Sequence, residues 1–144
     1  MPLIFRSMIN NSGKPTVGTD SNMLGVRVPP HPRADVTPDE AGIVRPGSGG
    51  MSVAPSWRKL PIFLIPSRLK HLVAGARGAD SLMCFQFGEG EFSDSSINSH
   101  LILRPNSATH GTVQPSRSMS LADFQQALAD TRNSWTVIDE EAQS

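Results

Sequence analysis

A glycine-rich segment between Pro46 and Pro55 contains the first side chain that could take part in chemistry, the hydroxyl of Ser52. The glycines before it, Gly49 and Gly50, can adopt positive φ and let a ligand approach the backbone closely. The segment is not a phosphate-binding loop, which needs a following Gly-Lys-Ser/Thr, and it lacks the second glycine of a nucleophile elbow. Two interpretations remain: a serine presented to a cleft, or an ordinary glycine-rich turn between strands.

An imidazole lies further along the chain, in the segment from Ala108 to Pro115. His110 follows Thr109 within a strand predicted over residues 109–114. A histidine can exchange a proton near neutral pH and can donate or accept hydrogen bonds. A lone histidine is nevertheless more often a surface residue or a satisfied core residue, so both interpretations stay open.

Two charged side chains are further candidates. Arg27 lies in a strand predicted over residues 23–28, on the face opposite its valine neighbours. That face is either solvated or borders a cleft, where a planar guanidinium suits a diphosphate or a ribose-linked anion. Glu91 closes the sequence Glu-Gly-Glu after a strand predicted over residues 82–87, a position that hairpin turns also favour.

The 144-residue chain is long enough for one domain with a core of its own. Its 13 basic side chains balance 13 acidic ones, so we expect no general attraction to nucleic acid or to an anionic membrane. The charges are sorted along the chain, because basic residues dominate before residue 78 and Asp139, Glu140 and Glu141 lie near the end. A local basic pocket is therefore compatible with the neutral total.

The single cysteine, Cys84, excludes an intramolecular disulfide and a cysteine-based zinc site. Its apolar neighbours favour a buried hydrophobic residue over a nucleophile. The four histidines show no metal-ligand spacing, so we expect no metal. No apolar run approaches the ~18 residues that span a bilayer, and the start does not resemble a secretory signal. We therefore expect a cytoplasmic protein, which a secretion machine that reads folded cargo could still export.

The hydrophobic patterns predict an α+β domain of short strands, long loops and one clear helix. The helix begins at Ser120, a capping residue, and its apolar residues recur on one face. We predict a mobile N-terminal arm over residues 1–22, a single domain over residues 23–138 and an acidic tail over residues 139–144. Strands are expected over residues 23–28, 43–45, 60–65, 82–87, 100–104, 109–114 and 135–138.

Together these segments resemble the ADP-ribosyltransferase-like toxins typified by the second exported effector of a type VI secretion system. The family pattern begins with a first strand that carries an arginine, which we match to Arg27. It continues with Gly-Gly-Thr-Ser-Val or Gly-Gly-Met-Ser-Val, matched by residues 49–53. It closes with Ala-Thr-His-x-Thr-x-x-Pro-x-x-x-Met, matched by residues 108–119, ahead of the last helix.

The resemblance implies a compact ADP-ribosyltransferase-like fold, NAD as substrate, and toxicity in the cytoplasm of a target cell. It also implies inhibition by a cognate immunity protein, and it leaves the target macromolecule open. Cofactor-binding roles fall on Arg27, Gly50, Ser52 and Thr109. Catalytic roles fall on Ser52, His110 and Glu91, with the glutamate stabilising the oxocarbenium-like ribose as nicotinamide departs.

The chain departs from the family pattern at two positions. Met51 replaces a threonine found in some relatives, and Ser107 stands where relatives can have glutamine. Either change is compatible with altered substrate choice or with a fold that has lost the transfer chemistry. The competing hypotheses are a non-catalytic interaction module, which acts by binding a target or an immunity partner, and an unrelated β-rich domain. The sequence does not separate a transferase from an NAD glycohydrolase.

Overall fold

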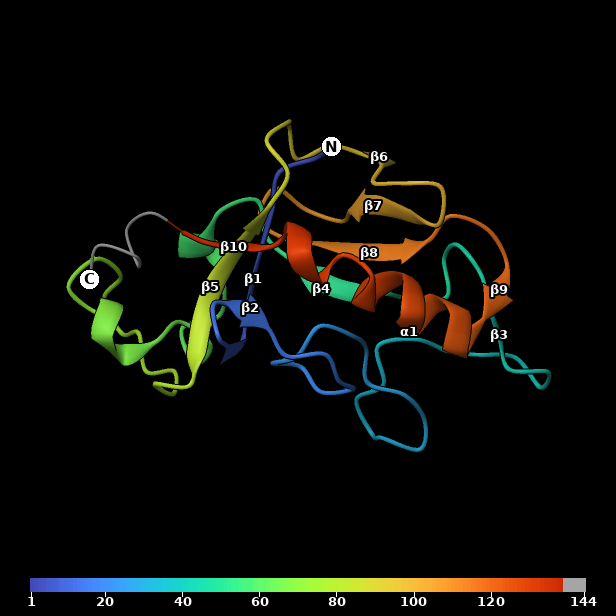
Figure 1. Ribbon diagram of the computed structural model, residues 1–144, viewed down its shortest axis with the longest axis horizontal. Helices are drawn as coiled ribbons and strands as arrows, with labels where there is room; N and C mark the ends of the chain where they lie inside the picture. The colour runs from blue at the N-terminus through green and yellow to red at the C-terminus, as the bar shows by residue number, and fades with distance from the viewer. Residues whose placement is uncertain (139–144) are drawn as a thin grey trace.

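The first of two four-stranded antiparallel sheets joins the N-terminal segment to the middle of the chain in the computed structural model, which describes residues 1–138. The strand order is β10-β5-β1-β2, and β1 pairs with β5 from Ile4 opposite Phe87 to Ile9 opposite Leu82. Figure 1 shows β1 and β5 side by side at the left of the molecule. The strands are β1 (Ile4–Asn11), β2 (Lys14–Pro15), β5 (Leu82–Phe87) and β10 (Thr136–Val137).

The second sheet has the order β4-β8-β7-β6 and is built around the hairpin of β7 and β8. Its edge strand β4 pairs Ser52 with Thr112 of β8. In Figure 1 this sheet lies to the right of β1 and β5. Its strands are β4 (Met51–Val53), β6 (Ser95–Ser96), β7 (Leu101–Pro105) and β8 (Gly111–Pro115), and a separate ribbon pairs β3 (Ile43–Val44) with β9 (Met119–Ser120).

One α-helix, α1 (Leu121–Ala129), lies within the described residues. The Ser120 hydroxyl accepts a hydrogen bond from the Asp123 amide at 3.0 Å, which confirms the predicted helix start. Phe124 and Leu128 are fully buried on its inner face. The α+β class is thus confirmed, and the strands predicted over residues 82–87, 100–104 and 109–114 correspond to β5, β7 and β8. The single-turn 3₁₀ helices are η1 (Trp57–Lys59), η2 (Ser67–Leu69) and η3 (Arg132–Ser134).

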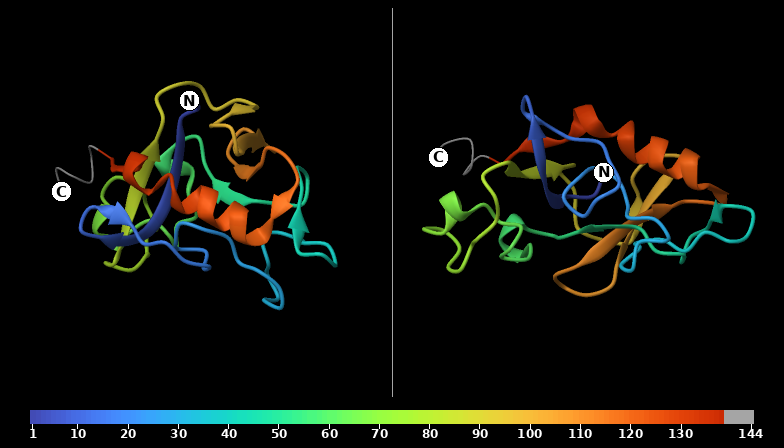
Figure 2. Two further views of the ribbon diagram at one scale, coloured as in Figure 1. Left: turned by 45° about the vertical axis from the view of Figure 1, so that its right-hand side comes forward. Right: turned by 90° about the horizontal axis from the view of Figure 1, so that it is seen from below.

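None of the helices within residues 1–138 combines the length and the apolar character that crossing a membrane requires. Figure 2 shows how α1 runs along the second sheet.

Side chains of the first sheet enter two hydrophobic clusters, because neighbouring strand residues point to opposite faces. Ile4 and Phe85 join the larger cluster, to which α1 and the second sheet also contribute. Phe5 and Cys84 join the smaller cluster together with the irregular segment over residues 54–76. The sheet is therefore covered on both faces, and the burial of Cys84 confirms its expected place in a hydrophobic core.

An isolated backbone bridge ties the two four-stranded sheets together. The amide of Phe5 donates to the carbonyl of Ala54 at 2.9 Å, and the amide of Ala54 donates to the carbonyl of Phe5 at 3.0 Å. This isolated bridge fixes β1 against the chain that leaves β4. The residue after Phe5 and the residues of β4 are therefore held close together, and this arrangement positions the site.

The mobile arm predicted over residues 1–22 is wrong. Ile4–Asn11 form β1, which lies between β5 and β2 in the first sheet. Its first residues are buried because β5 supplies a pairing partner that is remote in the sequence. The acidic tail predicted over residues 139–144 lies outside the described residues.

The strand predicted over residues 23–28 is also wrong. Leu24 makes a single isolated bridge with Val17. The amide side chain of Gln125 then accepts from the Val26 N–H at 3.2 Å and donates to the Val26 carbonyl at 3.0 Å. A side chain from α1 thus forms hydrogen bonds with the backbone groups that would otherwise pair with a neighbouring strand.

The strand predicted over residues 60–65 does not form either. The amides of Leu64 and Ile65 both donate to the Pro61 carbonyl, at 2.8 and 3.2 Å, and close a turn. Proline has no N–H to give to a ladder, which favours the turn over a strand. The turn leaves Phe63 56 % exposed although the pattern indicated a buried run.

Candidate functional site

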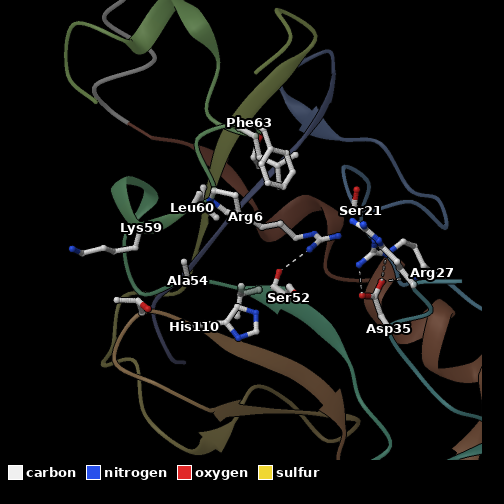
Figure 3. A pocket seen from close by; sticks show the side chains of 16 residues that line it. Arg6, Ser21, Arg27, Asp35, Ser52, Ala54, Lys59, Leu60, Phe63 and His110 are labelled. Atoms are coloured by element: carbon white, nitrogen blue, oxygen red, sulfur yellow. Dashed lines mark hydrogen bonds and ion pairs between the residues drawn. The ribbon is translucent and has the colours of Figure 1, made fainter. Parts of the chain in front are cut away.

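A cleft of about 440 Å³ opens beside the bridge that ties the two sheets together. Its size lies within the range of small-molecule sites. Figure 3 shows Arg6 near the centre of the cleft, with Ser52 and His110 on one side and Phe63 on the other. Its polar lining residues include Arg6, Arg27, Asp35, Ser52, Thr109 and His110.

Arg6 is the buried cation of this cleft, and its side chain is 5 % exposed. Its Nη1 donates to the carbonyl of Ser52 at 2.7 Å, and its Nη2 donates to the carbonyl of Met23 at 2.9 Å. Within residues 1–138 no carboxylate forms an ion pair with it. Burial of the charge therefore lowers the pKa of Arg6 from its ordinary value to about 10.

Arg27, in contrast, is already paired. Its Nη2 lies 2.9 Å from Asp35 Oδ1, and its Nε and backbone N–H donate to Asp35 Oδ2 at 3.2 and 2.7 Å. These hydrogen bonds to the carboxylate raise the pKa of Arg27 above its ordinary value. The arginine that the first strand presents without a carboxylate partner is Arg6, and Arg27 lies on an irregular segment.

The two motifs found in the sequence meet at this cleft. Ser52 comes from β4, while Thr109 and His110 come from the loop that leads into β8. No hydrogen bond within the described residues engages the Ser52 hydroxyl, so it is free to meet a ligand. The His110 Nδ1 lies 2.8 Å from the side-chain oxygen of Asn106. Ser52, Thr109 and Arg27 thus share one cleft with His110.

Gly50 and Glu91 do not line the cleft. Gly50 is buried, and a Cβ at this position would collide with the carbonyl of Val113 on β8. The glycine therefore allows close pairing of β4 with β8. Glu91 is exposed in the loop after β5, where the neighbouring Gly90 amide donates to the Met1 carbonyl at 2.9 Å.

The cleft has a surplus of positive charge. Four cationic side chains line it, namely Arg6, Arg27, Arg33 and Lys59. Among the described lining residues Asp35 is the one carboxylate, and Arg27 already engages it. Such a site favours an anionic ligand with several oxygens, because a guanidinium donates to phosphate oxygens in a planar fork. The described residues contain no group of three side chains that could hold a metal ion.

Sequence reasoning missed Arg6, although a signal was present. Arg6 interrupts the apolar run Leu3-Ile-Phe-Arg-Ser-Met-Ile9, and a charge within a buried strand requires partners. Such a charge indicates a functional site or a buried ion pair. The hydrogen-bond partners themselves, Ser52 and Met23, could not be read from the sequence.

A family model described as the Tse2 ADP-ribosyltransferase toxin matches residues 4–137, which is nearly the whole chain. The match begins at the first residue of β1, so it includes Arg6. Among curated proteins no relative matches the chain.

Proposed function

Because the chain belongs to the Tse2 ADP-ribosyltransferase toxin family, we propose that it binds NAD in this cleft and breaks the bond to nicotinamide. The ADP-ribose is then transferred to an acceptor or to water. The observation that carries the proposal is Arg6, a buried guanidinium without a carboxylate partner beside Ser52 and His110. A buried cation is stabilised most strongly by an anionic ligand, because water no longer solvates its charge.

The roles follow from the geometry. Arg6 would hold the diphosphate, since its guanidinium is buried and forms no ion pair with a described carboxylate. Ser52 would orient the nicotinamide ribose through its free hydroxyl. Arg27 would act mainly by fixing the wall of the cleft through Asp35. Thr109 would hold the loop that carries the imidazole, because its amide donates to the Ser107 hydroxyl at 3.2 Å.

The biological setting is proposed on the family. The protein would act as a toxin in the cytoplasm of a target cell, after delivery by a type VI secretion system, and a cognate immunity protein would neutralise it. A target macromolecule would be the acceptor if the reaction is a transfer.

This proposal is tested by incubating the purified protein with NAD that is labelled in the adenylate and in the nicotinamide. Release of nicotinamide, with or without label on lysate macromolecules, is expected for the wild type. Ser52→Ala should lower the release strongly, and Glu91→Gln, outside the cleft, should leave it unchanged. A folded, toxic protein that neither releases nicotinamide nor transfers label would contradict the proposal.

A non-catalytic interaction module remains the second candidate, and one observation favours it. The exposed Ile62 and Phe63 stand together on the turn before η2, 40 % and 56 % exposed, and Phe63 lines the cleft. Exposed apolar residues next to a cleft often mark a protein contact. If Ser52→Ala and His110→Ala both stay fully toxic at normal abundance, the binding function replaces the enzymatic one.

A further inference from the structure

We propose that His110 is the base that removes the proton from the attacking nucleophile, and that Asn106 holds its imidazole in the tautomer this task requires. The inference rests on the proposed NAD chemistry, and it adds the group that takes the proton from water or from another acceptor that carries one.

The reaction itself demands a proton acceptor. The C1′–N bond of NAD breaks with its electron pair going to the nitrogen, so nicotinamide leaves as a neutral molecule. The acceptor atom, which is the oxygen of water in hydrolysis, then forms a bond to C1′ and loses its proton. A positioned base that takes this proton speeds such a step by about 10²–10⁴-fold.

Among the described residues that line the cleft, few groups can accept a proton. Arg6, Arg27, Arg33 and Lys59 are cations that only donate. Asp35 has both carboxylate oxygens engaged by Arg27, at 2.9 Å for Oδ1 and at 2.7 and 3.2 Å for Oδ2. Glu91 does not line the cleft. His110 therefore remains as the side chain with a free basic atom.

Which nitrogen of His110 is basic depends on its neighbour. The Asn106 side-chain oxygen lies 2.8 Å from Nδ1, and an amide oxygen accepts but cannot donate. Nδ1 must then carry the hydrogen. Since a neutral imidazole has one N–H and one lone pair, the lone pair is left on Nε2.

The loop between β7 and β8 directs the ring. The backbone amides of Asn106 and Ser107 both donate to the His110 carbonyl, at 3.0 and 3.2 Å, and close the loop tightly. Asn106 lines a separate polar groove and not the cleft. The Nδ1 edge of the ring thus turns away from the cleft toward Asn106, and Nε2 is the nitrogen left for the cleft. Figure 3 shows the imidazole beside Ser52.

The tautomer can be measured without any substrate. Long-range ¹H–¹⁵N spectra of protein labelled in histidine, at a pH where the ring is neutral, should show the Nδ1–H form, with the signal assigned by its loss in His110→Gln. Asn106→Ala should move the population toward Nε2–H, and Asn106→Asp, which still offers an oxygen, should keep Nδ1–H. The Nε2–H form in the wild type would mean that the amide nitrogen faces Nδ1, and it would overturn the proposal.

The base role is tested with azide, a nucleophile that has no proton to lose. His110→Gln should lower nicotinamide release in water by about 100-fold or more, and Asn106→Ala should lower it by a smaller factor. Saturating azide should bring both variants back near the wild-type rate of azidolysis. Asn98→Ala, which disturbs the neighbouring β6–β7 loop, serves as the control and should change neither rate.

Two results count against the base. If azide fails to restore His110→Gln while the wild type reacts with azide, the imidazole binds NAD instead of taking a proton. If the wild type releases no nicotinamide with either nucleophile, the proposed function and the base role fail together. The tautomer measurement still decides the Asn106 contact in that case, so the two failures are distinguishable.

Discussion

Replacement of Arg6 by methionine should remove most of the stabilisation that an anionic ligand such as ADP-ribose gives to this protein. Burial lowers the pKa of Arg6 to about 10, more than two pH units below an ordinary arginine. At about 1.4 kcal/mol per pH unit, the fold disfavours the charged form by about 3 kcal/mol. A diphosphate that restores the ordinary pKa recovers about this amount, so Arg6→Met should lose about 150-fold in affinity.

The assay is thermal unfolding with and without ADP-ribose. At a ligand concentration near 100 times Kd, the wild type gains about 2.7 kcal/mol, or about 5–10 °C in Tm for a chain of 144 residues. At the same concentration Arg6→Met should gain only about 1 °C. The unliganded Tm should change little, because removal of the buried charge offsets the loss of the hydrogen bonds to Ser52 and Met23.

Arg58→Met is the matched control. Arg58 is an exposed arginine outside the cleft, packed over the ring of Trp57 at 4.7 Å, so its replacement should leave the ligand-induced shift intact. A full shift in Arg6→Met would refute the reasoning, since it would place the anion elsewhere. If both variants lost the ADP-ribose-induced shift in Tm equally, the ligand would respond to the overall charge of the protein and not to the cleft.

Three further predictions concern stability. Hydrogen bonding from the Ile43 amide lowers the pKa of Asp39, so this carboxylate stabilises the fold above its unfolded pKa and loses that effect as the pH falls through the lower folded value. In urea unfolding, the free energy of unfolding of Asp39→Asn should therefore fall less steeply than that of the wild type below about pH 4. The same pH dependence in both proteins would contradict this prediction. Gly50→Ala should cost about 1–3 kcal/mol by overpacking against β8, and a wild-type Tm would refute that close approach. Thr131→Val should cost about 1–3 kcal/mol in chemical unfolding, because the buried Trp135 indole N–H loses its acceptor at 2.9 Å, and a neutral effect would show that the indole finds another partner.

Local sequence signals predicted the elements that depend on near neighbours. The start of α1 follows from the Ser120 hydroxyl and the Asp123 amide, which lie within one turn. β5 could be predicted because its apolar run is bounded by turn residues. The strands β7 and β8 were predicted for the same reason, with their boundaries shifted by one or two residues, while their pairing as a hairpin was not predicted.

The predictions were wrong for segments whose structure depends on partners remote in the sequence. β1 was taken for a mobile arm because its pairing with β5 cannot be seen in either segment alone. Residues 60–65 have the composition of a strand, but the Pro61 carbonyl takes up the amides of Leu64 and Ile65 in a turn. Strand formation requires a partner with free backbone groups, and residue type does not guarantee one.

The sequence by itself determined the family, and it predicted four residues that line the cleft, namely Arg27 and, within the contiguous motifs, Ser52, Thr109 and His110. Only the tertiary structure decided which arginine lies buried in the cleft without a carboxylate partner. Arg27 has its carboxylate eight positions away, whereas Arg6 gains its place from carbonyls that the fold brings to β1 from Met23 and Ser52. The physical reason is that a buried charge is defined by everything packed around it, and those groups come from distant parts of the chain.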